Sequence, residues 1–156
     1  MNYNIGIKTV KEIWVASKRF NVPKTAQISK FLNKAFDELY NYIHQNSIGV
    51  EYFTAMFCYT PPSVFENIDM EAVVILRSPI KSSSGIQVYK LPETLVVSGV
   101  HVGEFSSFSD IHVEMGKWLI ENKYELCGAY REFYLKHDLR NLSDTITEVQ
   151  YPVKKT

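Results

Sequence analysis

Residues 5–17 read IGIKTVKEIWVAS, and residues 86–98 read IQVYKLPETLVVS. The two stretches align without a gap at an offset of 81 residues (86 minus 5), with identical residues at Ile5/Ile86, Glu12/Glu93, Val15/Val96 and Ser17/Ser98. Self-similarity at a fixed offset indicates a duplicated structural unit. The chain is therefore expected to contain two related halves, about 1–80 and 81–156.

Each copy of the repeat is followed by the same order of predicted elements. In the first half, an extended segment over about 10–20 leads into a helix for which Thr25 is the expected N-cap. Extended aromatic residues at 52–59 and a β-branched run at 70–76 follow. The apolar residues of the predicted helix recur every three or four positions: Ile28, Phe31, Leu32, Ala35, Phe36, Leu39 and Ile43.

The second half repeats this order. A strand over 94–102 is expected to end at Gly103, and Ser106 or Ser107 is the expected cap of the next helix. The apolar stripe of that helix consists of Phe108, Ile111, Met115, Trp118 and Leu119. The remaining strands are expected at 3–9, 86–91, 128–135 and 145–153.

These patterns predict the fold class. Each half reads strand–helix–strand–strand after a leading strand, and Lys81–Gly85 is expected to be a flexible linker between the halves. Neither half is long enough to bury its own helix and sheet well. We therefore predict a single α+β domain over 1–156 with pseudo-twofold symmetry, in which helices cover one side of an antiparallel sheet.

Composition limits the possible partners and the compartment. Lys plus Arg and Asp plus Glu both number 17, so the formal net charge is zero, and no long basic run offers a surface for nucleic acid. The sequence has no signal-peptide pattern and no apolar run long enough to span a membrane. Cys58 and Cys127 lie far apart and are expected to be reduced, which favours the cytoplasm.

Metal ions and cofactors are not predicted. His112 and His137 have no partner at a metal-ligand spacing, and the glycines form no phosphate-binding loop. The sequence also lacks a Gly-x-Ser-x-Gly pattern, so it offers no nucleophile elbow.

The strand predicted at 128–135 places a carboxylate between two tyrosines. Side chains alternate across a strand, so Tyr130, Glu132 and Tyr134 share one face, while Arg131 points to the other. A buried Glu is costly unless something compensates it. Two interpretations remain open: an ion pair with a Lys or Arg from another element, or a pocket for a cation or a proton transfer.

The aromatic content of the chain favours a pocket walled by rings. Tyr, Phe and Trp make up 13% of the chain, and many lie in predicted strands. Aligning Tyr59 with Tyr134 places Phe57 at the Glu132 position, so the two halves are expected to contribute facing strands. His101 shares the parity of Gly99 and is a further candidate for the pocket.

Three segments together resemble the GyrI-like family. They are His101-Val102-Gly103-Glu104-Phe105, Trp118-Leu119-Ile120 and Gly128–Tyr134, which are similar to the family's His-x-Gly-x-aromatic turn, helix Trp and Glu-x-Tyr strand. The resemblance spans nearly the whole chain. Glu132 matches the family's pocket carboxylate and Trp118 its helix Trp. Phe105 stands where the family usually has Tyr, which removes a hydroxyl from that position.

The resemblance implies a duplicated strand–helix–strand–strand fold and a central pocket for cationic or planar molecules. The same domain forms the effector-binding half of multidrug-responsive transcription regulators in bacteria. Because the first predicted strand begins within a few residues of Met1, a DNA-binding module in front of it is not expected. We therefore expect a stand-alone, regulator-like binding protein.

Three functions follow from these observations. The first is binding of lipophilic, cationic or planar organic compounds, by charge attraction to Glu132 and by ring contacts. The second, implied by the resemblance, is hydrolysis of cyclopropane-type electrophiles with Glu132 as the catalytic group. The third is interaction with a protein partner, such as DNA gyrase. The expected ligand-binding residues are Glu132, Tyr130, Tyr134, Phe57, Tyr59, Trp118, Phe105 and His101.

Overall fold

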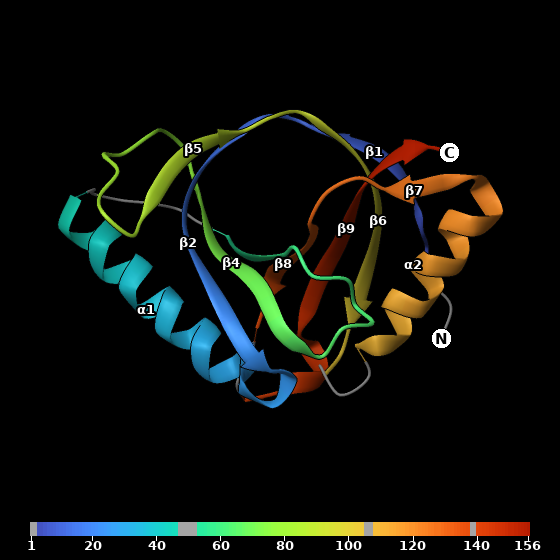
Figure 1. Cartoon of the computed structure of the whole chain (residues 1–156), viewed down its shortest axis with the longest axis horizontal. Helices are drawn as coiled ribbons and strands as arrows, with labels where there is room; N and C mark the ends of the chain where they lie inside the picture. Colours follow the sequence, from blue (N-terminus) through green and yellow to red (C-terminus); the bar gives the residue numbers. More distant parts are fainter. Residues whose placement is uncertain (1–2, 47–52, 105–107, 138–139) are drawn as a thin grey trace. The chain divides into compact units, whose positions relative to one another are not determined.

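The computed structural model describes residues 3–46, 53–104, 108–137 and 140–156 (Figure 1). Its internal contacts divide the chain into two compact units. Unit 1 consists of Met1–Val10 together with Thr94–Thr156, and unit 2 consists of Lys11–Glu93. Each unit contains one α-helix packed on antiparallel strands, which confirms the predicted α+β class with duplicated units.

Unit 2 is an antiparallel sheet with a long helix on one face. Its strands are ordered β3-β4-β2-β5. The central pair is the longest, because β2 and β4 remain in register from Trp14 opposite Leu76 to Lys24 opposite Glu66. The elements are β2 (Ile13–Lys24), α1 (Ile28–Asn46), β3 (Thr54–Cys58), β4 (Glu66–Leu76) and β5 (Gln87–Leu91).

The helical stripe predicted from the sequence is the face of α1 that packs on this sheet. Leu39 and Ile43 are buried and contact the helix-facing side chains of the strands, which include Ala16 and Val74. The predicted N-cap is wrong. Thr25 begins a short 3₁₀ turn in front of α1, and its hydroxyl donates to the carbonyl of Phe65 instead of capping the helix.

Unit 1 repeats this plan with shorter elements. Its strands are ordered β1-β6-β9-β8, and the short strand β7 pairs with the C-terminal end of β9. The elements are β1 (Gly6–Val10), β6 (Thr94–Val102), α2 (Ser109–Asn122), β7 (Tyr124–Leu126), β8 (Tyr130–Lys136) and β9 (Ile146–Lys155). Strand β7 was not predicted, because three residues are too few to show a period.

Helix α2 packs on one face of unit 1 through Ile111 and Met115, both fully buried. Gly99 in β6 makes this approach possible, since a Cβ there would lie 3.2 Å from Ile111 Cδ1. Lys123 ends the helix in the left-handed conformation, with a φ of 60°. The expected caps Ser106 and Ser107 lie outside the described residues.

The two leading strands do not pair with the strands that directly follow them. Strand β1 pairs with β6 in unit 1, and β5 pairs with β2 in unit 2. The predicted linker at Lys81–Gly85 lies within unit 2, where Ser83 and Ile86 form a bridge. The unit boundaries follow Val10 and Glu93, so each copy of the sequence repeat is divided between the two units.

Candidate functional site

Glu71 is a buried carboxylate at the centre of the unit 2 sheet. It lies in β4, and only 2% of its surface is exposed. Its neighbour Ala72 belongs to the core beneath α1, so the alternation of side chains places Glu71 on the face opposite the helix. A buried carboxylate is costly unless it is hydrogen-bonded. The hydrogen-bond donors that reach Glu71 are therefore the residues that stabilise its burial.

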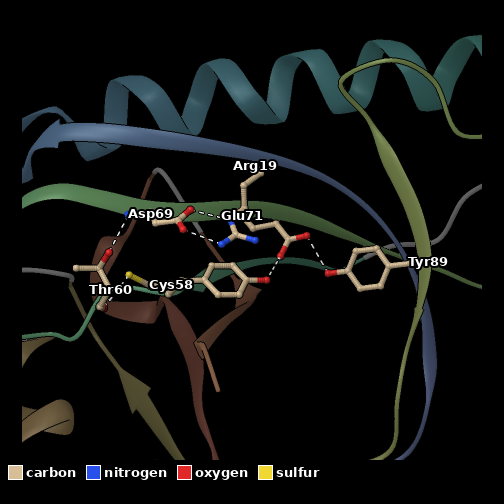
Figure 2. A network of polar contacts seen from close by, with 7 residues as sticks. Arg19, Cys58, Thr60, Asp69, Glu71 and Tyr89 are labelled. Carbon is tan, nitrogen blue, oxygen red and sulfur yellow. Dashed lines mark hydrogen bonds and ion pairs between the residues drawn. The ribbon is translucent and has the colours of Figure 1, made fainter. Parts of the chain in front are cut away.

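Two tyrosine hydroxyls donate to Glu71 (Figure 2). Tyr59, just after β3, donates to Oε1 over 2.6 Å, and Tyr89 of β5 donates to Oε2 over 2.8 Å. Burial, followed by the hydrogen bond to Glu71, raises the pKa of Tyr59 above its ordinary value. Burial and the charge of Glu71 likewise raise the pKa of Tyr89. Both hydroxyls thus remain protonated and available as donors at neutral pH.

Arg19 faces this carboxylate across the ladder, but its hydrogen bonds go elsewhere. It lies opposite Glu71 in the β2–β4 pair. Its Nε and Nη2 both donate to Asp69, each over 2.7 Å, and its guanidinium carbon lies 3.5 Å from the centre of the Tyr59 ring. The Arg19 hydrogen bond holds the pKa of Asp69 below its usual value. Among the described residues, the side chains that donate to Glu71 are therefore neutral ones.

Glu132, the carboxylate predicted from the sequence, lies in a different setting in unit 1. It is in register with Val149, whose side chain belongs to the core beneath α2, so Glu132 is on the helix-facing side of its sheet. Tyr134 donates to its Oε1 over 3.1 Å, and His112 of α2 approaches its Oε2 at 3.3 Å. The interpretation of Glu132 as half of a polar pair thus finds a histidine partner rather than Lys or Arg.

The His112 ring joins Glu132 to a third polar group. Its Nδ1 lies 2.6 Å from the Tyr151 hydroxyl. An ionised carboxylate only accepts, so with Glu132 ionised and the ring neutral, Nε2 is the donor to Glu132 and Nδ1 is the acceptor from the Tyr151 hydroxyl. Burial, followed by the charge of Glu132, raises the pKa of Tyr151. This chain of hydrogen bonds fastens α2 to β8 and β9.

Of two other predicted residues of unit 1, His101 is in the core and the partly buried Trp118 packs against the core. His101 is fully buried, with Tyr3 Oη at 2.9 Å from its Nδ1 and the Glu104 carbonyl at 3.1 Å from its Nε2. Trp118 packs near Tyr124, with ring centres 5.7 Å apart. Phe105, the remaining predicted residue of this unit, lies outside the described residues.

The predicted tyrosine and phenylalanine residues of the strands thus fall into two groups, one beside Glu71 and one beside Glu132. Phe57 and Tyr59 lie in unit 2 beside Glu71, with Phe57 directly opposite it in the β3–β4 ladder. Tyr130 and Tyr134 lie in unit 1 on the same face as Glu132. The alignment of Phe57 with Glu132 is wrong, because Phe57 lies on the face opposite its helix and Glu132 lies on the helix-facing side.

From the sequence, Glu71 at the start of a predicted strand is expected to pair with a neighbouring Lys or Arg rather than to line a pocket, and Tyr89 is not singled out as its partner. A signal was present, since Glu71 is the one charged residue between Met70 and Leu76 in an otherwise apolar predicted strand. The same argument that drew attention to Glu132 therefore applied to it. Tyr89 lies within the repeated segment, but nothing local shows that it reaches a carboxylate two strands away.

Two features are absent from the described ranges, a cluster of metal ligands and a helix able to span a membrane. Within them, no three His, Cys, Asp or Glu side chains lie close enough together to hold a metal ion. The helices of the described chain are also too short or too polar to cross a bilayer.

A family model for the GyrI-like small molecule binding domain matches residues 3–154. The chain belongs to this family. The match covers both units and confirms the resemblance drawn from the three segments described above. No curated protein sequence matches the chain.

Solved structures share the fold at low sequence identity. The C-terminal domain of EcmrR is 23% identical, with a TM-score of 0.86 and full coverage of both chains. In the complex of EcmrR with DNA, the match covers 99% of this chain but 58% of the EcmrR chain, at 22% identity and a TM-score of 0.88. A hydrolase from Listeria innocua is 13% identical, with a TM-score of 0.66 and coverage of 96% and 91%. SAV2435 bound to tetraphenylphosphonium is 13% identical, with a TM-score of 0.63 and coverage of 99% and 94%.

Proposed function

We propose that this GyrI-like domain binds lipophilic organic cations and that Glu71 is the carboxylate that attracts them. The observation that carries the proposal is a carboxylate with 2% exposure whose two oxygens accept from tyrosine hydroxyls. The tyrosine donors carry no charge, and the facing guanidinium of Arg19 donates its hydrogen bonds to Asp69, so Arg19 acts on Glu71 through charge attraction without a direct ion pair. A cation close to Glu71 would therefore regain electrostatic energy that the burial of the carboxylate costs.

Aromatic rings around Glu71 support the same ligand class. Phe57 and Tyr59 lie in or just after β3, which pairs with β4, and Tyr89 lies in β5, two strands from β4. Each ring that faces a ligand cation contributes on the order of 0.5–2 kcal/mol. SAV2435, a structural neighbour, is described in complex with tetraphenylphosphonium, which is a cation of this type. This compound is accordingly the first probe to test.

The test is a fluorescence titration of the wild-type protein and three matched variants with tetraphenylphosphonium. We expect Glu71→Gln to weaken binding at least about tenfold, or roughly 1.4 kcal/mol. Glu132→Gln and Glu148→Gln remove carboxylates from unit 1 and are expected to leave the affinity unchanged. Tetraphenylborate, which has the same shape and the opposite charge, is expected not to bind. If Glu132→Gln weakened binding about tenfold and Glu71→Gln left the affinity unchanged, the binding site would be assigned to Glu132 instead.

A second candidate function is hydrolysis, for which the contact between Glu132 and His112 provides a specific argument. A carboxylate that accepts from one ring nitrogen of His orients the imidazole as a general base. Because the other nitrogen of His112 is paired with the Tyr151 hydroxyl, that hydroxyl would have to move away before His112 could act on water. The Listeria innocua neighbour is described as a hydrolase. Turnover of a strained electrophile that is lost in His112→Gln but retained in Glu71→Gln would establish this function. Turnover that is the same in both variants would exclude the His112 assignment.

A further inference from the structure

Both units place a carboxylate at the same position of their central strand. In unit 2, Glu71 lies between Phe57 of β3 and Arg19 of β2. In unit 1, Glu148 of β9 lies between Phe133 of β8 and Val100 of β6. The offset of 81 residues in the sequence repeat makes position 100 the equivalent of position 19 (19 plus 81). The strand pairing and the sequence repeat therefore identify Glu71 and Glu148 as equivalent residues.

The leading strands bring different residues to these two carboxylates. Tyr89 of β5 lies opposite Val15, and Lys8 of β1 lies opposite Val96. Val15 and Val96 are equivalent in the repeat, so Lys8 and Tyr89 occupy the same place in their units. Each reaches the carboxylate of its own unit, since the Tyr89 hydroxyl donates to Glu71 and Lys8 Nζ lies 2.7 Å from Glu148 Oε2.

The surroundings of Glu148 are those of an ammonium site. Ser98 Oγ donates to Oε2 over 3.2 Å, and Gln150 Nε2 donates to it over 2.6 Å. The buried Oε1 of Gln150 has no hydrogen-bond partner among the described residues and is a further acceptor in this region. The Glu148 side chain is 14% exposed, whereas the Lys8 side chain is 48% exposed. A partly buried carboxylate therefore meets an ammonium group that enters from the solvent side.

We propose that Glu148, with Ser98 and Gln150, forms a second site for organic ammonium groups, and that Lys8 occupies it as a tethered ligand. The proposal rests on the proposed function in one respect. It assumes that Glu71, the equivalent of Glu148 in unit 2, binds an external cation because Tyr89 stands where unit 1 has Lys8. Tethering gives the Lys8 ammonium a high effective concentration at Glu148, so external amines compete poorly. The residue on the leading strand thus determines which unit accepts a ligand.

Chemical rescue tests the site directly. Lys8→Ala removes Cγ, Cδ, Cε and Nζ, which are the atoms that n-propylammonium supplies. We expect propylammonium chloride to raise the melting temperature of Lys8→Ala with saturating concentration dependence, relative to sodium chloride at equal ionic strength. The wild-type protein, in which Lys8 holds the site, is expected to show no such difference. Tetramethylammonium, which has no N–H donors, is expected to be ineffective.

Two further variants distinguish binding at Glu148 from a general effect of the salt. The double variant Lys8→Ala/Glu148→Gln is expected to lose the rescue, because the carboxylate is gone. Lys8→Thr, a truncation suited to a strand, repeats the comparison if Lys8→Ala folds poorly. Equal shifts in the wild type and all variants would identify a salt effect and overturn the proposal. The absence of a propylammonium-specific shift in both truncations would overturn it as well.

The Glu71→Gln background distinguishes the two proposals. Rescue of Lys8→Ala/Glu71→Gln by propylammonium would establish the Glu148 site even if tetraphenylphosphonium binding does not depend on Glu71. Conversely, tetraphenylphosphonium binding that requires Glu71, without any rescue of the Lys8 truncations, would support the proposed function and refute the second site.

Discussion

Unit 2 and unit 1 carry carboxylates at the same ladder position but satisfy them with different donors. Glu71 accepts from two tyrosine hydroxyls, whereas Glu148 accepts from an ammonium, a hydroxyl and an amide. The residue at the same position of each leading strand, Tyr89 or Lys8, accounts for much of this difference. The duplicated units thus hold one carboxylate with two neutral donors and one with a direct ion pair.

The unit 2 carboxylate also differs from Glu132, which lies on the helix-facing side of its sheet. There, His112 of α2 contacts the carboxylate and so fastens the helix to β8, and Tyr134 of β8 donates to its other oxygen. Glu132 on the helix side is paired with a residue of that helix, whereas Glu71 on the opposite side accepts from residues of the strands and of the segment just after β3. This difference in face is the physical reason for preferring Glu71 as the binding residue.

The largest expected effect on stability is the loss of the Tyr89 hydroxyl, which is compared with the loss of the Lys8 ammonium group. Tyr89→Phe removes a hydrogen bond to a buried carboxylate and is expected to lower the free energy of unfolding by about 1.5–3 kcal/mol. Lys8→Met removes a contact that is half exposed on the Lys8 side, and about 1 kcal/mol or less is expected. Urea unfolding at pH 7 measures both values. Equal losses would show that the two carboxylates depend equally on their leading strands.

An alkaline titration sharpens the same comparison. The pKa of Tyr89 is raised in the folded state, so its contribution to stability is fully present below about pH 10 and is lost as the pH rises further. The stability difference between the wild type and Tyr89→Phe is expected to shrink between pH 10 and 11, by up to about 1.4 kcal/mol per pH unit. Urea unfolding at pH 8, 10 and 11 tests this, and curves that stay parallel would contradict it.

The smallest expected effect concerns the Arg19–Asp69 pair beside Glu71. The pKa of Asp69 is lowered in the folded state, so its contribution is present above about pH 4 and is lost as the pH falls through the lowered value. Both side chains are close to half exposed, so Asp69→Asn is expected to cost less than about 1 kcal/mol at pH 6. The cost is expected to shrink progressively as the pH falls below 4. A difference that stays constant from pH 6 down to pH 2 would refute an electrostatic origin.

Local patterns were sufficient for most of the fold. The apolar stripe from Ile28 to Ile43 predicted α1, and Gly103 was correctly expected to end the strand that became β6. These features depend on periodicity and backbone preference, which neighbouring residues decide. The candidate site was harder to predict, since the direction of Glu132 toward α2 depends on which face of the strand the helix covers. A shift of one residue in the alignment of the halves reverses that face.

The sequence by itself determined the duplication and the class of fold, because repeats and periodicities are written along the chain, and the resemblance of three segments indicated the family. It also contained Lys8 and Tyr89 at positions that the repeat relates. Only the tertiary structure decided that β1 pairs with β6 and β5 with β2, and hence which leading-strand residue meets which carboxylate. Strand pairing joins residues far apart in the sequence, and no local preference specifies such partners.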